Sequence, residues 1–181
     1  HASDKVLKAM GRKSRQKDLT SLIARLRAEV PDIILRTSLI AGFPGETEDD
    51  FKALCDFIAE NPLDRVGVFA YSKEEGTPAA IMKKQVPEKI KQERKNRLLD
   101  IQQDIAQAQA MKRVGKVYDV LIEGVADDGI FYRGRSYGEA PEIDPLIYVA
   151  SAEPLNAGDF VKVKVLDINK MDLIGEVEGY D

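Results

Sequence analysis

The sequence predicts a two-part fold, in which an α/β segment with parallel strands precedes a small antiparallel β-barrel. In residues 1–111, short apolar strands alternate with helices whose apolar residues repeat every 3.6 positions. From Lys116 onwards, apolar residues instead recur at every second position in several short runs. The charge changes at the same boundary, because residues 1–111 hold 19 Lys/Arg and 17 Asp/Glu, whereas residues 112–181 hold 8 and 14.

Composition limits the classes of protein to consider. The chain has 181 residues, 44% of them apolar and 32% charged, as is typical of a globular protein. It contains neither a membrane-spanning apolar run nor a signal-peptide pattern, so we expect a cytoplasmic protein with no membrane partner. One cysteine, Cys55, excludes a disulfide or a multi-cysteine metal site within the chain. The only histidine is the first residue, which argues against a Ser-His-Asp triad.

The first residues are expected to form two helices. One begins at Ser3-Asp4 and ends at Gly11. The basic sequence at 11–16, GRKSRQ, is then expected to be a solvated connector, with anion binding as the alternative. The apolar face of the second helix contains Leu19, Leu22, Ile23, Leu26 and Val30.

The segment at 33–58 is expected to form a strand, a glycine turn and a helix. The apolar residues at 33–40 indicate a strand buried on both faces, as in parallel sheets. Thr47 is expected to cap the helix, and Asp50 to complete a capping box. A turn that follows a parallel strand lies where α/β proteins bind their ligands. The turn at 42–45 is therefore either a cofactor contact or an ordinary connection.

A second parallel strand at 66–71 and a helix from Pro87 to about Met111 complete the α/β segment. Two strands are too few for a stable parallel sheet, so we expect a fragment whose remaining barrel strands lie outside this sequence. The basic start of the long helix indicates a solvated face, with RNA contact as the alternative. The apolar stripe of this helix is expected to contain Ile90, Leu98, Ile101, Ile105 and Ala108.

The last part of the chain is expected to form a five-stranded barrel. The strands are placed at 116–123, 130–133, 146–149, 161–165 and 174–177, with Asp128-Gly129 as the first hairpin turn. This number and spacing are typical of OB-like barrels. The excess of acidic residues would repel RNA and attract a basic protein. The loop at 135–144 is expected to bind that partner, or else to cover the end of the barrel.

Four stretches resemble one enzyme family, the radical S-adenosylmethionine methylthiotransferases: HASDKVLKAMGR, LRTSLIAGFPGETEDDF, DRVGVFAYSKEEGTPAA and GRSYGEAPEID. The chain resembles their C-terminal half. Residues 1–82 correspond to the later part of the TIM-like radical-SAM α/β barrel, residues 83–112 to a linker helix, and residues 113–181 to a TRAM domain. The sequence APEID resembles the branch that modifies a ribosomal protein, although Pro145 follows it where that branch more often has Gly.

The resemblance implies an enzyme that adds a methylthio group to the β-carbon of an aspartate in a small-subunit ribosomal protein. Its cofactors would be S-adenosylmethionine and two 4Fe–4S clusters. The cysteines that bind these clusters in the family are absent from this chain, so we expect no catalytic or metal-binding residue here and no activity of the chain alone. The alternatives are a tRNA adenosine methylthiotransferase and a non-catalytic binding module. The acidic barrel favours the ribosomal protein over tRNA as the partner.

The resemblance also implies two groups of site residues. The residues expected to contact S-adenosylmethionine are Gly42, Phe43, Pro44, Gly45, Glu46, Phe69 and Tyr71. The residues expected to contact the protein substrate are Arg135, Tyr137, Glu139, Glu142 and Asp144. Met10 and Arg12 belong to a loop that is expected to approach the active site.

Overall fold

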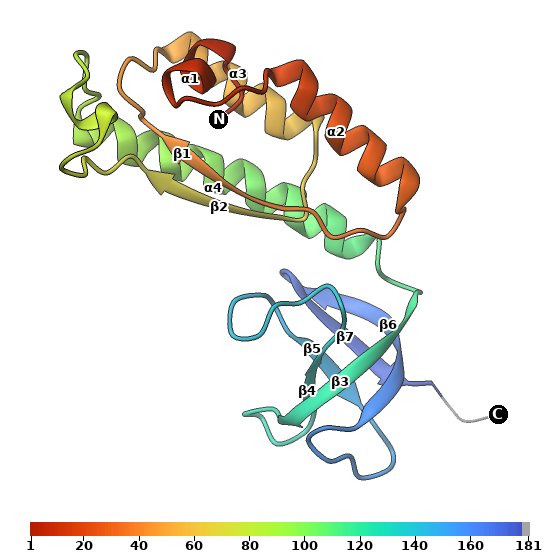
Figure 1. Ribbon diagram of the computed structural model, residues 1–181. Coiled ribbons are helices and arrows are strands. Elements are labelled where there is room, and N and C mark those ends of the chain that lie inside the picture. Colours follow the sequence, from red (N-terminus) through yellow and green to blue (C-terminus); the bar gives the residue numbers. More distant parts are fainter. Residues whose placement is uncertain (179–181) are drawn as a thin grey trace. The chain divides into compact units, whose positions relative to one another are not determined.

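The computed structural model describes residues 1–178 and has two compact units, His1–Ile105 and Ala106–Asp181. The first unit combines helices with two parallel strands, and the second contains a five-stranded barrel (Figure 1). The predicted fold class is therefore confirmed. None of the helices in the described part of the chain has the length and apolar character that crossing a membrane requires.

The first unit is built around two strands, β1 (Arg36–Ala41) and β2 (Arg65–Ala70), which pair in parallel along their whole length. Helix α3 (Glu48–Glu60) connects them. The remaining elements of this unit are α1 (Asp4–Ala9), α2 (Gln16–Glu29), the 3₁₀ helix η1 (Pro78–Ile81) and most of α4 (Glu88–Met111).

The core of this unit lies on one face of the two strands. Phe51 and Leu54 of α3 are fully buried and pack in one cluster with Leu39 of β1 and Leu98 of α4. The side chain of Ile40 points the other way and is 38% exposed. The prediction of a strand buried on both faces is thus wrong for the described residues, because helices cover only one face of β1. The strand also begins at Arg36, later than expected.

The buried face of α4 differs from the predicted apolar stripe. Leu98 is fully buried, as expected, but Ile90 and Ala108 are exposed. Basic residues near the start of the helix, Lys91 and Arg94, are buried instead. The prediction of a solvated basic face is therefore wrong for these two residues. They can be buried because their charged ends have acidic partners: Lys91 pairs with Glu88 at 3.1 Å, and Arg94 pairs with Glu46 and Glu48.

The second unit is a closed barrel with the strand order β3-β4-β5-β7-β6. Its inner face is apolar, since every second residue along the longer strands joins one buried cluster. The pairing of β5 with β7 is parallel and all other pairs are antiparallel. The strands are β3 (Val117–Val125), β4 (Tyr132–Arg135), β5 (Ile147–Ala150), β6 (Phe160–Asn169) and β7 (Asp172–Val177).

Candidate functional site

The predicted turn lies directly after the carboxyl end of β1. Gly42 and Gly45 have φ angles of 76° and 82°, which only glycine adopts without strain. A Cβ atom on Gly42 would lie 2.4 Å from Cγ of Lys91, so the turn also packs closely against α4. The helix that follows is capped as predicted, because the Thr47 hydroxyl accepts a hydrogen bond from the Asp50 amide and the Asp50 carboxylate accepts one from the Thr47 amide.

The side chain of Glu46 forms hydrogen bonds with the backbone of this turn. Its carboxylate accepts hydrogen bonds from the backbone N–H of Gly42 at 2.9 and 3.0 Å, and a longer one from that of Phe43 at 3.4 Å. The side chain of Glu46 is fully buried. The backbone N–H groups of Gly42 and Phe43 are therefore used within the turn, and that of Gly45 donates to the carbonyl of Lys84 at 2.9 Å.

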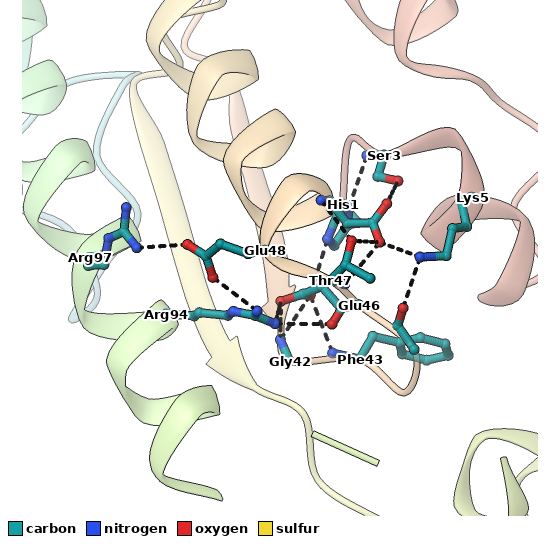
Figure 2. Close-up of polar contacts among 12 residues, drawn as sticks. His1, Ser3, Lys5, Gly42, Phe43, Glu46, Thr47, Glu48, Arg94 and Arg97 are labelled. Atoms are coloured by element: carbon teal, nitrogen blue, oxygen red, sulfur yellow. Dashed lines mark hydrogen bonds and ion pairs between the residues drawn. The ribbon is translucent and has the colours of Figure 1, made fainter. Parts of the chain in front are cut away.

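Arg94 of α4 neutralises Glu46. The guanidinium donates a hydrogen bond of 2.8 Å to Oε1 of Glu46 and one of 3.1 Å to the more exposed Glu48 (Figure 2). It also lies over the ring of Phe51, with 5.3 Å between Cζ and the ring centre. Among the described residues, Nε of Arg94 is buried without a hydrogen-bond partner. Arg94 thus fixes the turn to α4, a role that sequence reasoning missed.

A second carboxylate, Asp50, holds α1 against the same turn. Its oxygens accept hydrogen bonds from Ser3 at 2.6 Å and from Lys5, whose ammonium also donates to the carbonyl of Gly45. Burial alone would raise the pKa of Asp50, but the hydrogen bonds from Lys5, Ser3 and Thr47 outweigh it and hold the pKa well below its usual range.

The aromatic residues predicted to contact the cofactor lie in two different places. Phe69 is 57% exposed and pairs across the strands with Ile40, on the face of the sheet that no described helix covers. Tyr71 is buried against Phe43, with ring centres 5.4 Å apart. The Tyr71 hydroxyl is buried without a hydrogen-bond partner in the described part of the chain, and Nζ of Lys91 lies 5.2 Å from the centre of the Tyr71 ring. Phe43 and Tyr71 therefore belong to one cluster, and Phe69 to an open apolar surface.

The close contact at Gly42 leads to a first prediction. Gly42→Ala is expected to destabilise the first unit by roughly 2 kcal/mol, because the new methyl group adds a clash with Lys91 to the strain of a positive φ. The control is Gly11→Ala, since Gly11 also has a positive φ but no atom within 4 Å of the added Cβ. Urea unfolding measures both variants. Equal losses would show that the contact with Lys91 contributes nothing.

The loop predicted to bind the protein substrate is anchored to the barrel by a buried charge pair. Arg113 donates hydrogen bonds to Glu139 and, at 2.9 Å, to the hydroxyl of Ser136. The other oxygen of Glu139 accepts from the hydroxyl and the backbone N–H of Ser136. The Arg113 guanidinium also lies over the ring of Tyr118, at 4.4 Å from its centre. Burial would raise the pKa of Glu139, but Arg113 and Ser136 lower it below its ordinary value.

The five residues predicted to contact the substrate differ in their exposure and in their pairing within the chain. Glu139 faces inward, whereas Tyr137 is 66% exposed and Glu142 is also exposed. The guanidinium of Arg135 is paired with Glu123 at 2.8 Å, and Asp144 accepts a hydrogen bond from the backbone N–H of Ala140. Of the five predicted residues, Tyr137 and Glu142 are therefore the exposed ones.

The lowered pKa values of two carboxyl groups predict sensitivity to acid. Each carboxylate binds protons less tightly in the folded than in the unfolded chain, so its contribution to stability is complete above its ordinary pKa, 3.8 for Asp50 and 4.5 for Glu139. That contribution is lost as the pH falls from these values towards the lowered ones. Urea unfolding from pH 7 to pH 2 measures the effect. In Asp50→Asn and in Glu139→Gln, the free energy of unfolding should fall less steeply with decreasing pH than in the unchanged chain. The same pH dependence in both variants would show that these two carboxyl groups do not cause the acid sensitivity.

In the part of the chain that the structure describes, no group of three or more His, Cys, Asp or Glu residues is arranged to hold a metal ion. Cys55 of α3 is partly buried beside the core of the first unit. Burial raises the pKa of its thiol, which disfavours the thiolate that metals and electrophiles require.

Comparison with known proteins gives a consistent set of matches. A sequence model of the TRAM domain family matches residues 114–177. Three similar proteins are each described as ribosomal protein uS12 methylthiotransferase RimO. They are those of Acetivibrio thermocellus (56% identity over 177 residues), Lachnoclostridium phytofermentans (50% over 179) and Clostridioides difficile (47% over 177). Each alignment covers 98% of this chain but only 39–40% of the relative, so the chain spans about two fifths of the length of these relatives.

Proposed function

We propose that this chain, which is homologous to the uS12 methylthiotransferases of the RimO family and carries a TRAM domain, is part of an enzyme that methylthiolates an aspartate of ribosomal protein uS12. The observation that supports this most strongly is the 56% identity to one such enzyme, over 98% of the chain. The aspartate β-carbon would be the site of modification, and the reaction would take place in the cytoplasm.

The carboxyl end of the β1–β2 sheet supports a site for S-adenosylmethionine. The open apolar face of Ile40 and Phe69 suits an adenine ring, and the buried Tyr71 hydroxyl is a polar group without a hydrogen-bond partner among residues 1–178. The turn residues Gly42, Phe43, Pro44 and Gly45 would border the cofactor through backbone and ring atoms. Glu46 would act indirectly, by holding the turn in shape, because its oxygens are bound to Gly42 and Arg94.

The iron–sulfur clusters of the proposed enzyme would be held elsewhere. When bound, they supply the electron that starts radical chemistry from S-adenosylmethionine. The residues of this chain do not fit such a cluster, because it has one cysteine, and that thiol is partly buried with a raised pKa. The contribution of this chain would be to border the cofactor and to bind the protein substrate, and we expect no activity from it alone.

The charge of the second unit supports a protein substrate over tRNA. Residues 112–181 hold 14 acidic and 8 basic side chains, and ribosomal proteins are typically basic because they bind RNA. The second candidate function is that of a tRNA methylthiotransferase. Its TRAM domain would be expected to bind RNA, which the acidic charge of residues 112–181 disfavours. The exposed Tyr137 and Glu142 of the loop would contribute to protein binding, while Glu139 would keep the loop in place.

Binding of the chain to the two substrates tests this proposal. Purified uS12 and purified tRNA are each passed over the immobilised chain at increasing salt concentration. We expect uS12 to be retained at low salt and released as salt screens the charges. Retention of tRNA without uS12 would favour the second candidate and contradict the charge argument.

A further inference from the structure

The barrel has a groove on its outer surface that is separate from the loop at 135–144. Its volume is about 380 Å³, and it lies over β4, β5 and β7 beside the turn between β3 and β4. Its floor is a row of cross-strand neighbours, Arg133, Tyr148 and Ile174, whose side chains point away from the core. The turn residues Asp127 and Asp128 form one side.

Two aromatic rings in this groove take no part in the barrel core. Phe131 and Tyr148 lie edge to face, with ring centres 6.3 Å apart, and both are partly exposed. The buried cluster inside the barrel and the side chains packed against it include neither residue. Large rings that are held on an outer surface beside a hollow, without contributing to the core, are typical of binding sites.

The groove also contains charged side chains that can still form ion pairs or hydrogen bonds with a ligand. Asp128 uses Oδ1 to accept hydrogen bonds from the backbone N–H of Ile130 and Phe131, which fixes the turn. Among the described residues, Asp127 and Arg133 form no ion pair, and both are exposed. The groove thus combines two carboxylates at one end, two rings, and one guanidinium on its floor.

We propose that this groove binds an extended segment of a basic protein. A Lys or Arg side chain of that segment lies over the ring of Tyr148 and reaches the carboxylate of Asp127, where cation–π attraction and ion pairing act together. Arg133 binds a carboxylate or carbonyl oxygen of the same segment and so sets its direction. The inference rests on the proposed function, because it names the part of the barrel that receives the protein substrate.

The charges favour a protein segment over a single-stranded nucleic acid. Stacked bases would suit the two rings, but most nucleic-acid affinity comes from neutralised phosphates. The groove offers one guanidinium against two carboxylates, within a unit that already has six more acidic than basic side chains in residues 112–181. A cationic peptide would be attracted both by the two rings and by the excess of carboxylates.

Fluorescence anisotropy with the full chain tests this proposal, with purified uS12 and an oligouridine RNA as the labelled probes. Tyr148→Ala is expected to weaken uS12 binding about tenfold by removing the ring, and Asp127→Lys to weaken it most at low salt. The matched control is Phe160→Ala, because Phe160 of β6 is a 72% exposed aromatic residue outside the groove. This control should bind as the unchanged chain does, and far-UV circular dichroism should confirm that all variants fold.

The outcomes separate this inference from the proposed function. If the unchanged chain binds uS12 and both groove variants bind it equally well, the groove is not the binding site, while the proposed function stands. If the unchanged chain does not bind uS12, the docking role of the barrel in the proposed function fails as well. RNA binding that Tyr148→Ala weakens would also overturn the inference, since it assigns the groove to nucleic acid.

Discussion

Glu46→Ala is expected to lower the free energy of unfolding of the first unit by about 3–5 kcal/mol. The substitution leaves the guanidinium of Arg94 buried without its main partner, and the ion pair that remains to it among the described residues is the one with Glu48 on the surface. It also removes the acceptor for the backbone N–H groups of Gly42 and Phe43. Both effects act on the same turn. Urea unfolding, followed by far-UV circular dichroism, measures the loss.

Two further variants make this expectation specific. Glu46→Gln keeps the shape of the side chain and one amide-accepting oxygen, so it should recover part of the loss. Glu48→Ala removes the other, solvent-exposed partner of Arg94 and should cost much less, because surface ion pairs contribute little. If Glu46→Ala and Glu48→Ala destabilised the chain equally, Glu46 would not be the residue that holds the turn.

Arg113→Ala is expected to destabilise the second unit by a similar amount, about 3–5 kcal/mol, and to release the loop at 135–144. Glu139 would then be a buried carboxylate that keeps its hydrogen bonds from the hydroxyl and backbone N–H of Ser136 but has lost the guanidinium that neutralises it. The packing of the guanidinium on Tyr118 would be lost as well. Hydrogen exchange measured by NMR distinguishes release of the loop from destabilisation of the whole unit. If the loop is released, its amides should exchange faster than those of the β3–β6 pairs.

The double variant Arg113→Met/Glu139→Leu serves as the control, because replacing both charges with apolar side chains leaves no unpaired charge. It should be clearly more stable than Arg113→Ala. Glu142→Ala, at an exposed position of the same loop, should leave stability nearly unchanged. A double variant as unstable as Arg113→Ala would show that packing, and not charge burial, dominates this site.

The features that could be predicted from sequence depend on neighbouring residues. The Thr47–Asp50 capping box spans four positions, and the turn glycines follow directly after a strand, so both follow from local pattern. The barrel strands follow from their two-residue periodicity. Both patterns can be recognised without knowing which residues are in contact in the tertiary structure.

The roles of Arg94 and Glu139 could not be predicted in this way. Arg94 lies in a run of basic residues that resembles any solvated helix face, and its partner Glu46 is 48 positions away in the sequence. Glu139 pairs with Arg113 over 26 positions. Burial of a charge depends on a partner that only the tertiary structure brings close, so sequence pattern assigned these residues to a surface or to a ligand contact.

The identity of the modified substrate is the central point of the proposed function. The measurement is mass spectrometry of uS12 and of tRNA after incubation with the proposed complete enzyme, S-adenosylmethionine, a reductant and a sulfide salt as the sulfur source. We predict that a uS12 peptide gains the mass of a methylthio group on an aspartate, while tRNA adenosine is unchanged. Methylthiolated tRNA together with unmodified uS12 would contradict the proposed function.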